Sequence, residues 1–246
     1  MTTSGVYVTT VTATQLITDS MVDLGILDLE ESPSANQLAM GIRRLNDVLY
    51  QLKGPTSHFS PSEKPWTRET TSITPKATAE YYTLAPSGGD EAIQIPTEIL
   101  AVRLRHTSTL TDTLLKPMTS AEYLAIGSKT SAGTPQRYYY EKRIATGVLY
   151  VDCYASADIV ANYTLELDYR QPLEIVTAGT QTLDLPDWWN RALRWLTARE
   201  MGVGFTIDEK TWQRVVAMSN EAMAIAASHD TENPVAYFQP GKDVDE

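Results

Sequence analysis

Few residues in this chain have types and spacings that could carry out chemistry. The three histidines, His58, His106 and His229, lie in a Pro/Ser loop, at a strand end and at a helix end. None has a second histidine three or four residues away, the spacing that places two imidazoles on one helix face to bind a metal. We expect exposed polar side chains at all three positions, with no metal and no cofactor.

The other short motifs also fit ordinary structural roles. The segment GSKTSAG at 127–133 superficially suggests a phosphate-binding loop, but in such loops the Gly-Lys-Thr run is contiguous and the lysine opens a helix after a strand. We therefore expect a surface loop there. The single cysteine, Cys153, excludes an internal disulfide and a Cys-based zinc cluster. We expect it to be a small apolar residue in a strand.

A pair of carboxylates could serve glycoside hydrolysis, one as general acid and the other as base or nucleophile. With 31 Asp and Glu residues in the chain, some pairs lie within reach of one another by chance. Glu30-Glu31 is the most obvious pair, but it lies in a link between predicted helices, where both groups are expected to be solvated. A cell-wall hydrolase stays open as an alternative, and a cleft with two facing acids would distinguish it.

The charge balance is acidic, with a net charge of −11 and a pI near 4.8. This argues against a protein that grips nucleic acid through its phosphates, which needs clustered Lys and Arg. It does not exclude one that surrounds nucleic acid without holding it. Residues 1–14 lack the charged and apolar regions of a signal peptide, so we expect none. No run of about 18 apolar residues occurs, so we expect no membrane span.

Apolar residues recur at helical spacing over residues 1–54. A strong signal for a helix start follows: either Ser32 with Pro33 at a first-turn position, or Ser34 with Gln37 as a capping box. Behind it runs an apolar stripe with spacings of three and four: Leu38, Ile42, Leu45, Leu49 and Leu52. Asn46 lies beside this stripe, where we expect an exposed or capping amide. The helix is predicted to end at Gly54-Pro55.

Residues 55–185 show the alternation that is typical of strands. The longest run has apolar residues at every second position from Ile159 to Tyr169. It predicts an antiparallel strand with one packed and one solvated face. Two further strands flank a short loop at 145–147, as in a hairpin. We expect one short helix among the strands, at 120–126.

Residues 186–229 return to helical spacing, with Asp208 as the N-cap of the last helix. The stretch 230–246 has little to bury and is predicted to be extended. The fold class is therefore α+β. Helices from 1–54 and 186–229 pack as one discontinuous bundle, and an antiparallel β domain, residues 55–185, is inserted between them.

Aromatic residues are concentrated at the edges of predicted elements: Trp188, Trp189, Trp212, Tyr138, Tyr139 and Tyr140. Successive side chains of a strand point to opposite faces, so the tyrosine triplet makes both faces aromatic. Either that strand is buried on both faces, or one face contacts another subunit, where tyrosine and tryptophan are enriched. All six residues are candidates for a subunit interface. No catalytic constellation accompanies them, so the sequence favours a protein that acts by binding its neighbours.

Several motifs carry a family resemblance: QLITDSMVDLGI at 15–26, SPSAN at 32–36, LNDVL at 45–49, YTL at 82–84, KPM at 116–118, GTP at 133–135 and LP at 185–186. In these motifs the chain resembles the head-to-tail adaptor proteins of short-tailed bacteriophages, also called tail accessory or packaged-DNA stabilisation proteins. The motifs cover nearly the whole chain, but they are structural rather than catalytic.

The resemblance implies a structural, non-enzymatic virion protein, made in the host bacterial cytoplasm and located at the head–tail interface. It implies a ring, usually of twelve copies, below the portal, which extends the DNA channel and joins the portal to the tail nozzle and fibres or spikes. DNA would pass through without specific binding. The C-terminal tail would reach the portal, with Val235, Ala236, Tyr237 and Phe238 as its binding residues. A nozzle or fibre-attachment subunit is the alternative virion role.

Overall fold

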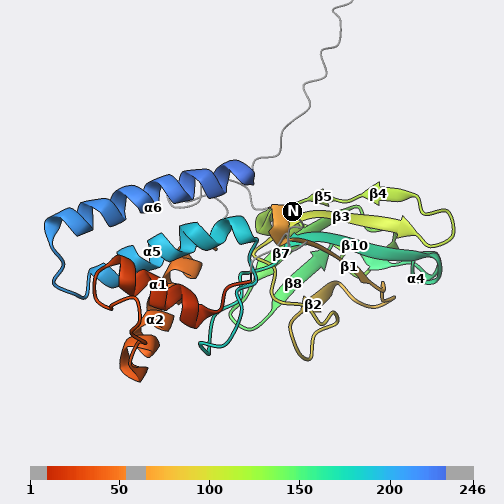
Figure 1. The fold of residues 1–246 in the computed structure, drawn as a ribbon. Coiled ribbons are helices and arrows are strands. Elements are labelled where there is room, and N and C mark those ends of the chain that lie inside the picture. Colours follow the sequence, from red (N-terminus) through yellow and green to blue (C-terminus); the bar gives the residue numbers. More distant parts are fainter. Residues whose placement is uncertain (1–9, 54–64, 231–246) are drawn as a thin grey trace, which may run out of the picture.

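The computed structural model describes residues 10–53 and 65–230. Two bodies lie side by side, a helical bundle and a β region (Figure 1). The bundle contains four helices: α1 (Ala13–Asp23), α2 (Ala35–Leu52), α5 (Asn190–Gly202) and α6 (Glu209–His229). Because α5 contacts α1, α2 and α6, helices from both sides of the β region in the sequence share one core. The α+β fold with a discontinuous bundle is confirmed.

The helix starts follow the capping signals in the sequence. Ser34 accepts from the backbone N–H of Gln37, and the Gln37 side chain accepts from the backbone N–H of Ser34. Thr12 caps α1 in the same reciprocal way. The α1 helix stops before Gly25, whose φ of +71° is a left-handed conformation that favours glycine. These local signals explain why the predicted helices of the bundle are found in the structure.

Asp208 makes the start of α6 sensitive to acid. Its Oδ1 accepts from the backbone N–H of Thr211 at 2.9 Å, and hydrogen bonds from Thr211 hold the pKa of the carboxyl below its usual range. A depressed folded-state pKa stabilises the fold above the unfolded-state pKa, and this contribution is lost as pH falls through the folded-state pKa. At pH 7 we expect the free energy of unfolding of the wild type to be higher than that of Asp208→Ala. Below about pH 4 we expect the difference between the two proteins to become smaller. Urea unfolding at both pH values tests this, with Asp208→Asn as a cap that does not titrate.

The α1 and α2 helices approach each other closely at Gly41. A Cβ added at Gly41 would lie 2.3 Å from Cγ2 of the fully buried Ile17. Gly41→Ala is therefore expected to lower the free energy of unfolding by about 1–2 kcal/mol, because the steric cost exceeds the gain in helix propensity. Gly127→Ala, where a Cβ would meet nothing within 4 Å, is the matched control. Thermal denaturation of both variants checks this, and equal stability would contradict the close packing.

The β region contains two four-stranded sheets and one two-stranded sheet. The first sheet has the order β1-β10-β3-β4 and is antiparallel throughout, and the second has the order β2-β8-β7-β5. The strands are β1 (Arg68–Ile73), β2 (Tyr81–Leu84), β3 (Glu98–His106), β4 (Asp112–Leu114), β5 (Lys116–Pro117), β6 (Ala132–Gly133), β7 (Arg137–Lys142), β8 (Gly147–Val151), β9 (Tyr154–Ala155) and β10 (Tyr163–Arg170). The two large sheets enclose a second core between them, with Leu104, Leu149 and Leu167 among its buried members.

Two details of the β region differ from the predictions. The pairs β5–β7 and β6–β9 are parallel, in an otherwise antiparallel region. The predicted strand from Ile159 begins instead with a helix, α4 (Ala157–Asn162), because Ser156 caps it by accepting from the backbone N–H of Ile159. The alternation of Ile159 and Ala161 was therefore misleading. The predicted hairpin of β7 and β8 and the short helix α3 (Ser120–Leu124) are confirmed.

The segment at residues 171–186 connects β10 to the bundle and is held by α2. The Asn46 amide donates from Nδ2 to the carbonyl of Val176 and accepts at Oδ1 from its backbone N–H, both at 2.8 Å. Thus Asn46 is neither a cap nor merely exposed, which corrects the prediction. It satisfies both backbone groups of a buried residue, Val176, which is 5% exposed. This pairing fixes the path of the chain between the two bodies.

Candidate functional site

Three tryptophan side chains meet one buried carboxylate where the bundle adjoins the β region. Asp230 is only 2% exposed and is the C-cap of α6. Its Oδ2 accepts from Nε1 of Trp189 at 2.9 Å and of Trp66 at 3.2 Å. Its Oδ1 accepts from Nε1 of Trp188 at 3.0 Å. We call these four residues the Asp230 cluster.

The members of the Asp230 cluster come from distant parts of the sequence. Trp66 lies in η1 (Pro65–Thr67), just before β1, and Trp188 and Trp189 lie in η2 (Asp187–Trp189), just before α5. The rings of Trp66 and Trp189 meet edge to face at 6.4 Å between centroids. A carboxylate at a helix C-terminus is disfavoured by the helix dipole, and a buried charge is costly unless hydrogen-bonded. Because the indole N–H groups supply those bonds, the cluster fixes the end of α6 against the starts of β1 and α5.

The C-terminal segment begins directly after the Asp230 cluster. The predicted portal-binding residues Val235, Ala236, Tyr237 and Phe238 lie outside the described residues. The sequence analysis predicted that Asp230 belongs to the extended tail. This is wrong for Asp230, which is buried and hydrogen-bonded. The last described residue before this segment is therefore held by three indole N–H groups.

The three tryptophans proposed for a subunit interface have different environments. Trp189 is fully buried in the core of the bundle, so the interface role is corrected for this side chain. Trp188 is 40% exposed. Trp212 is half-buried, and its ring packs so closely on Gly202 that an added Cβ there would lie 2.6 Å from it. An interface role for Trp188 and Trp212 stays a prediction.

The tyrosine triplet points to both faces of β7, as the alternation requires. Tyr138 is buried in the core of the β region, and Tyr140 donates its hydroxyl to the carbonyl of Pro96 at 2.8 Å. Burial raises the pKa of the Tyr140 hydroxyl, so it stays protonated as a donor. The interface role is thus corrected for Tyr138, and Tyr140 is engaged within its own chain. Tyr139 points to the opposite face and keeps the role as a prediction.

Tyr139 belongs to a row of rings across the outer face of the second sheet. Tyr150 lies between Tyr81 and Tyr139 in the register of the strands, with ring centroids 5.8 and 5.7 Å from theirs. Tyr123 from α3 completes the row, 4.8 Å from Tyr150. Burial and the neighbouring Glu80 carboxylate raise the pKa of Tyr123 to about 12. Because the rings contact one another, this row stabilises the sheet as cross-strand pairs do.

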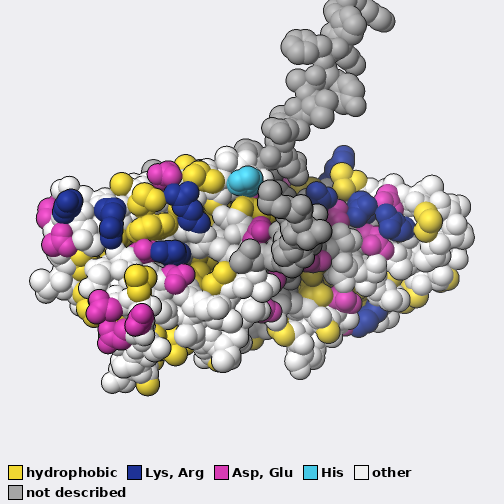
Figure 2. Space-filling view, in the orientation of Figure 1, with side chains coloured by type: hydrophobic (Ala, Val, Ile, Leu, Met, Phe, Trp, Pro, Cys, Tyr) yellow, Lys and Arg dark blue, Asp and Glu magenta, His cyan; other side chains and the backbone are white. Residues whose placement is uncertain are grey.

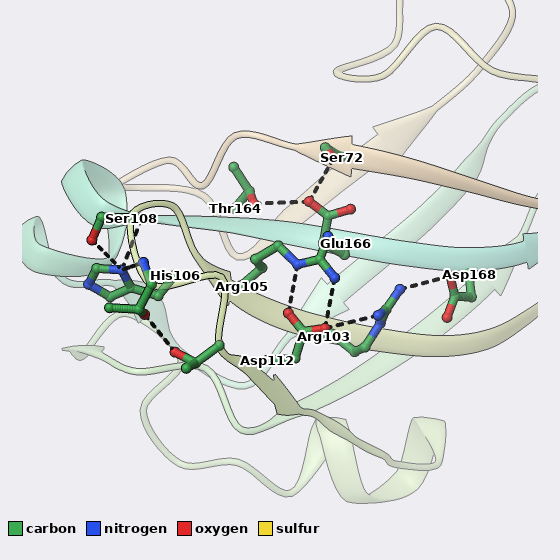
Figure 3. A network of polar contacts seen from close by, with 11 residues as sticks. Ser72, Arg103, Arg105, His106, Ser108, Asp112, Thr164, Glu166 and Asp168 are labelled. Atoms are coloured by element: carbon green, nitrogen blue, oxygen red, sulfur yellow. Dashed lines mark hydrogen bonds and ion pairs between the residues drawn. The ribbon is translucent and has the colours of Figure 1, made fainter.

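The first sheet carries a buried carboxylate pair on its outer face (Figure 3). Glu166 and Asp168 are 7% and 6% exposed and lie two residues apart on β10. Glu166 accepts from the Ser72 hydroxyl at 2.7 Å, and Asp168 accepts from the Thr70 hydroxyl at 2.8 Å and from Arg103 Nη2 at 3.0 Å. The two acids are neighbours on one strand and do not face each other across a cleft.

The same network continues to β4 through Asp112. Arg105 donates to Asp112 from Nε at 2.7 Å and Nη2 at 2.9 Å, and Arg103 donates from Nη1 at 3.0 Å. The Arg105 guanidinium holds the pKa of the Asp112 carboxyl below its usual range. The network therefore pairs acids with arginines and hydroxyls between strands. It gives the hydrolase alternative no specific support.

The histidines and Lys129 have contacts that do not indicate metal or phosphate binding. His106 accepts at Nδ1 from the backbone of Ser108, His229 is exposed, and His58 lies outside the described residues. Lys129 donates to the carbonyl of Ile126 and lies 4.9 Å from the Tyr123 ring, and no helix follows it. Within residues 10–53 and 65–230, no group of three or more His, Cys, Asp or Glu residues could hold a metal ion.

Comparison with protein families decides the identity. The family model described as SU10 adaptor protein matches residues 11–237. The chain belongs to the SU10 adaptor protein family. It is a phage head–tail adaptor, as the resemblance of its motifs predicted. No curated protein matches the chain.

Within residues 10–53 and 65–230 of this SU10 adaptor, no helix has the length and hydropathy of a membrane span. On the face shown in Figure 2, Lys and Arg side chains are interspersed with Asp and Glu and do not form one basic patch. The family match extends beyond Asp230 to residue 237. The matched range therefore spans the positions of the Asp230 cluster and the first residues of the C-terminal segment.

Proposed function

We propose that this SU10 adaptor forms a ring below the portal of a tailed phage. The ring has twelve copies, the number implied by the resemblance to phage head-to-tail adaptors. The ring extends the DNA channel and joins the portal to the tail nozzle and fibres. The observation that carries this proposal is the family match over residues 11–237. The protein acts in the virion, at the head–tail interface, and has no catalytic role.

The C-terminal segment is proposed to bind the portal through Val235, Ala236, Tyr237 and Phe238. Buried aromatic residues commonly carry much of the free energy of an interface. The fixed position of Asp230 supports this role, because a segment that leaves a rigid point loses less freedom on binding than one that leaves a mobile end. Three side chains are proposed to contact neighbouring subunits: the exposed Trp188 and the partly buried Trp212 and Tyr139.

The proposed ring surrounds double-stranded DNA without binding it specifically. The chain has a net charge of −11, and a channel wall of the same sign as the phosphates repels them. DNA can then pass during packaging and ejection without adhering. A channel wall made mainly of Lys and Arg, in the assembled particle, would contradict this part of the proposal.

Mass photometry of the purified chain, alone and mixed with the portal of the same phage, tests the proposed function. The expected result is a stoichiometric complex of adaptor chains on the portal, whose mass gives the number of copies. If no complex with the portal forms over the accessible concentration range, the proposal is wrong and a nozzle or fibre-attachment role is favoured.

A further inference from the structure

The link between α1 and α2 presents an exposed leucine on a hydrogen-bonded turn. Leu29 is 89% exposed. The backbone N–H of Glu31 donates to the carbonyl of Asp28 at 3.0 Å, which closes the turn with Leu29 inside it. Leu24 and Leu27, both buried, hold the preceding chain against the bundle core. The side chain of Leu29 is therefore presented to solvent by a fixed backbone. We call residues 28–31 the Leu29 turn.

The charge of the Leu29 turn indicates what it would bind. Asp28, Glu30 and Glu31 are all exposed, so three carboxylates surround one apolar side chain. The surface that complements this turn has an apolar hollow for the leucine and positive charge at its rim. A fixed turn loses little conformational entropy when it binds.

A cleft lined by apolar side chains and one lysine, together with Gln94 and Glu174, lies where α2 ends against segment 171–186. The cleft has a volume of about 350 Å³. Two of its residues, Tyr50 and Ile175, are large hydrophobic side chains that are 56% and 48% exposed. Its lining residues are Tyr50, Lys53, Gln94, Pro172, Leu173, Glu174 and Ile175. We call this the junction cleft.

Lys53 gives the lining of the junction cleft a positive charge. Its ammonium lies 5.7 Å from the centroid of the Tyr50 ring. Burial and the Lys142 charge lower the pKa of Lys53. Among the described residues, Lys53 makes no ion pair, although Glu174 lines the same cleft. An acidic partner would therefore supply a counter-charge to Lys53.

The Leu29 turn cannot reach the junction cleft of its own chain. The turn precedes the first residue of α2 and Lys53 follows its last, and this helix of 18 residues is about 27 Å long. A contact between the two surfaces therefore joins different copies. A contact between unlike surfaces of identical chains is heterologous, and it generates a ring if the rotation closes.

We propose that the Leu29 turn of one adaptor copy binds the junction cleft of the next, with Leu29 against the apolar side chains of the cleft and its acidic neighbours beside Lys53. This inference rests on the proposed ring and names the contact between its subunits. Both partner surfaces belong to the described fold, so the contact needs no change in secondary structure.

Photo-cross-linking tests the contact directly. Leu29 is replaced by p-benzoylphenylalanine in isotopically heavy chain, which is mixed with light wild-type chain, both free at high concentration and bound to the portal. After irradiation, mass spectrometry is expected to find cross-links from heavy position 29 to light peptides that contain 50–53 or 172–175. Inter-chain cross-links to other surfaces, cross-links within one chain, or no cross-links in either condition would each overturn the proposal.

A pair of matched variants gives an independent measurement. Leu29→Asp is expected to weaken association between copies at least tenfold in sedimentation equilibrium or in the filling of portal sites. Val203→Asp removes another exposed side chain of the bundle, 75% exposed between α5 and α6, and is expected to leave association unchanged. Equal effects of both variants would contradict a specific Leu29 contact. Circular dichroism shows that each variant is folded.

The test separates this inference from the proposed function. If the chain binds the portal but position 29 cross-links elsewhere, the subunit contact is wrong and the adaptor role stands. If the expected cross-links form in free chain that does not bind the portal, the contact stands and the proposed function fails.

Discussion

Asp230→Ala is expected to lower the free energy of unfolding by about 2–3 kcal/mol. The substitution removes the acceptor of three indole N–H groups. Trp189 is fully buried, so its N–H would stay unpaired, and a buried unpaired donor costs about 1–3 kcal/mol. Trp66 and Trp188 are partly exposed and can recover hydrogen bonds from water, so they add less. Urea denaturation, followed by tryptophan emission, measures the effect.

The Asn variant shows whether the carboxylate itself is required. Asp230→Asn keeps the shape, but its amide has one oxygen, and the NH2 group would face an indole N–H that also donates. We therefore expect Asp230→Asn to lose most of what Asp230→Ala loses. Asp187→Asn, an acid in η2 outside the Asp230 cluster, is the matched control. Wild-type stability of both Asp230 variants would show that the cluster does not stabilise the junction.

The local signals in the sequence were sufficient for most of the bundle. The capping box at Ser34 acts within a few residues, so the start of α2 could be predicted without tertiary information. Thr12 and Gly25 bound α1 by equally local contacts, although the capping box at Thr12 was not predicted. The alternation from Ile159 failed because Ser156, outside the alternating run, caps a short helix. The cap at Ser156 thus determined the local structure at the start of the alternating run. Only the later part of the run forms the predicted strand, as β10.

The candidate site was less predictable, because its residues meet only in the folded chain. Asp230 is separated from Trp66 by 164 residues and from Trp189 by 41. From the sequence alone, an acid at a helix end such as Asp230 is expected to be solvated. The sequence also does not distinguish Trp189, which is buried, from its neighbour Trp188, which is 40% exposed. The same holds for Asn46, whose partner Val176 lies 130 residues away. A buried indole or amide group needs a hydrogen-bond partner. This requirement was the one feature of the sequence that indicated such contacts, and it does not identify the partner.

Deletion of residues 231–246 is expected to abolish portal binding while the fold stays intact. The buried cores lie between Ala13 and Ala226, and Asp230 is retained, so thermal denaturation should match wild type. Aromatic anchors commonly contribute 2 kcal/mol or more each, and each 1.4 kcal/mol is tenfold in affinity. With Tyr237 and Phe238 both removed, affinity for the portal should fall at least about 100-fold, as measured by mass photometry across a titration.

Two shorter changes separate the aromatic residues of the tail from its charges. The double variant Tyr237→Ala, Phe238→Ala should reproduce most of the loss, because it removes the proposed anchors and leaves every charge. Deletion of 242–246 removes Lys242 and the acids after it but keeps the anchors, and is expected to bind nearly as wild type at physiological salt, where exposed charges are screened within about 8 Å. If the full deletion still binds the portal with wild-type affinity, the contact lies on the folded part of the adaptor, and the position of Asp230 serves stability alone.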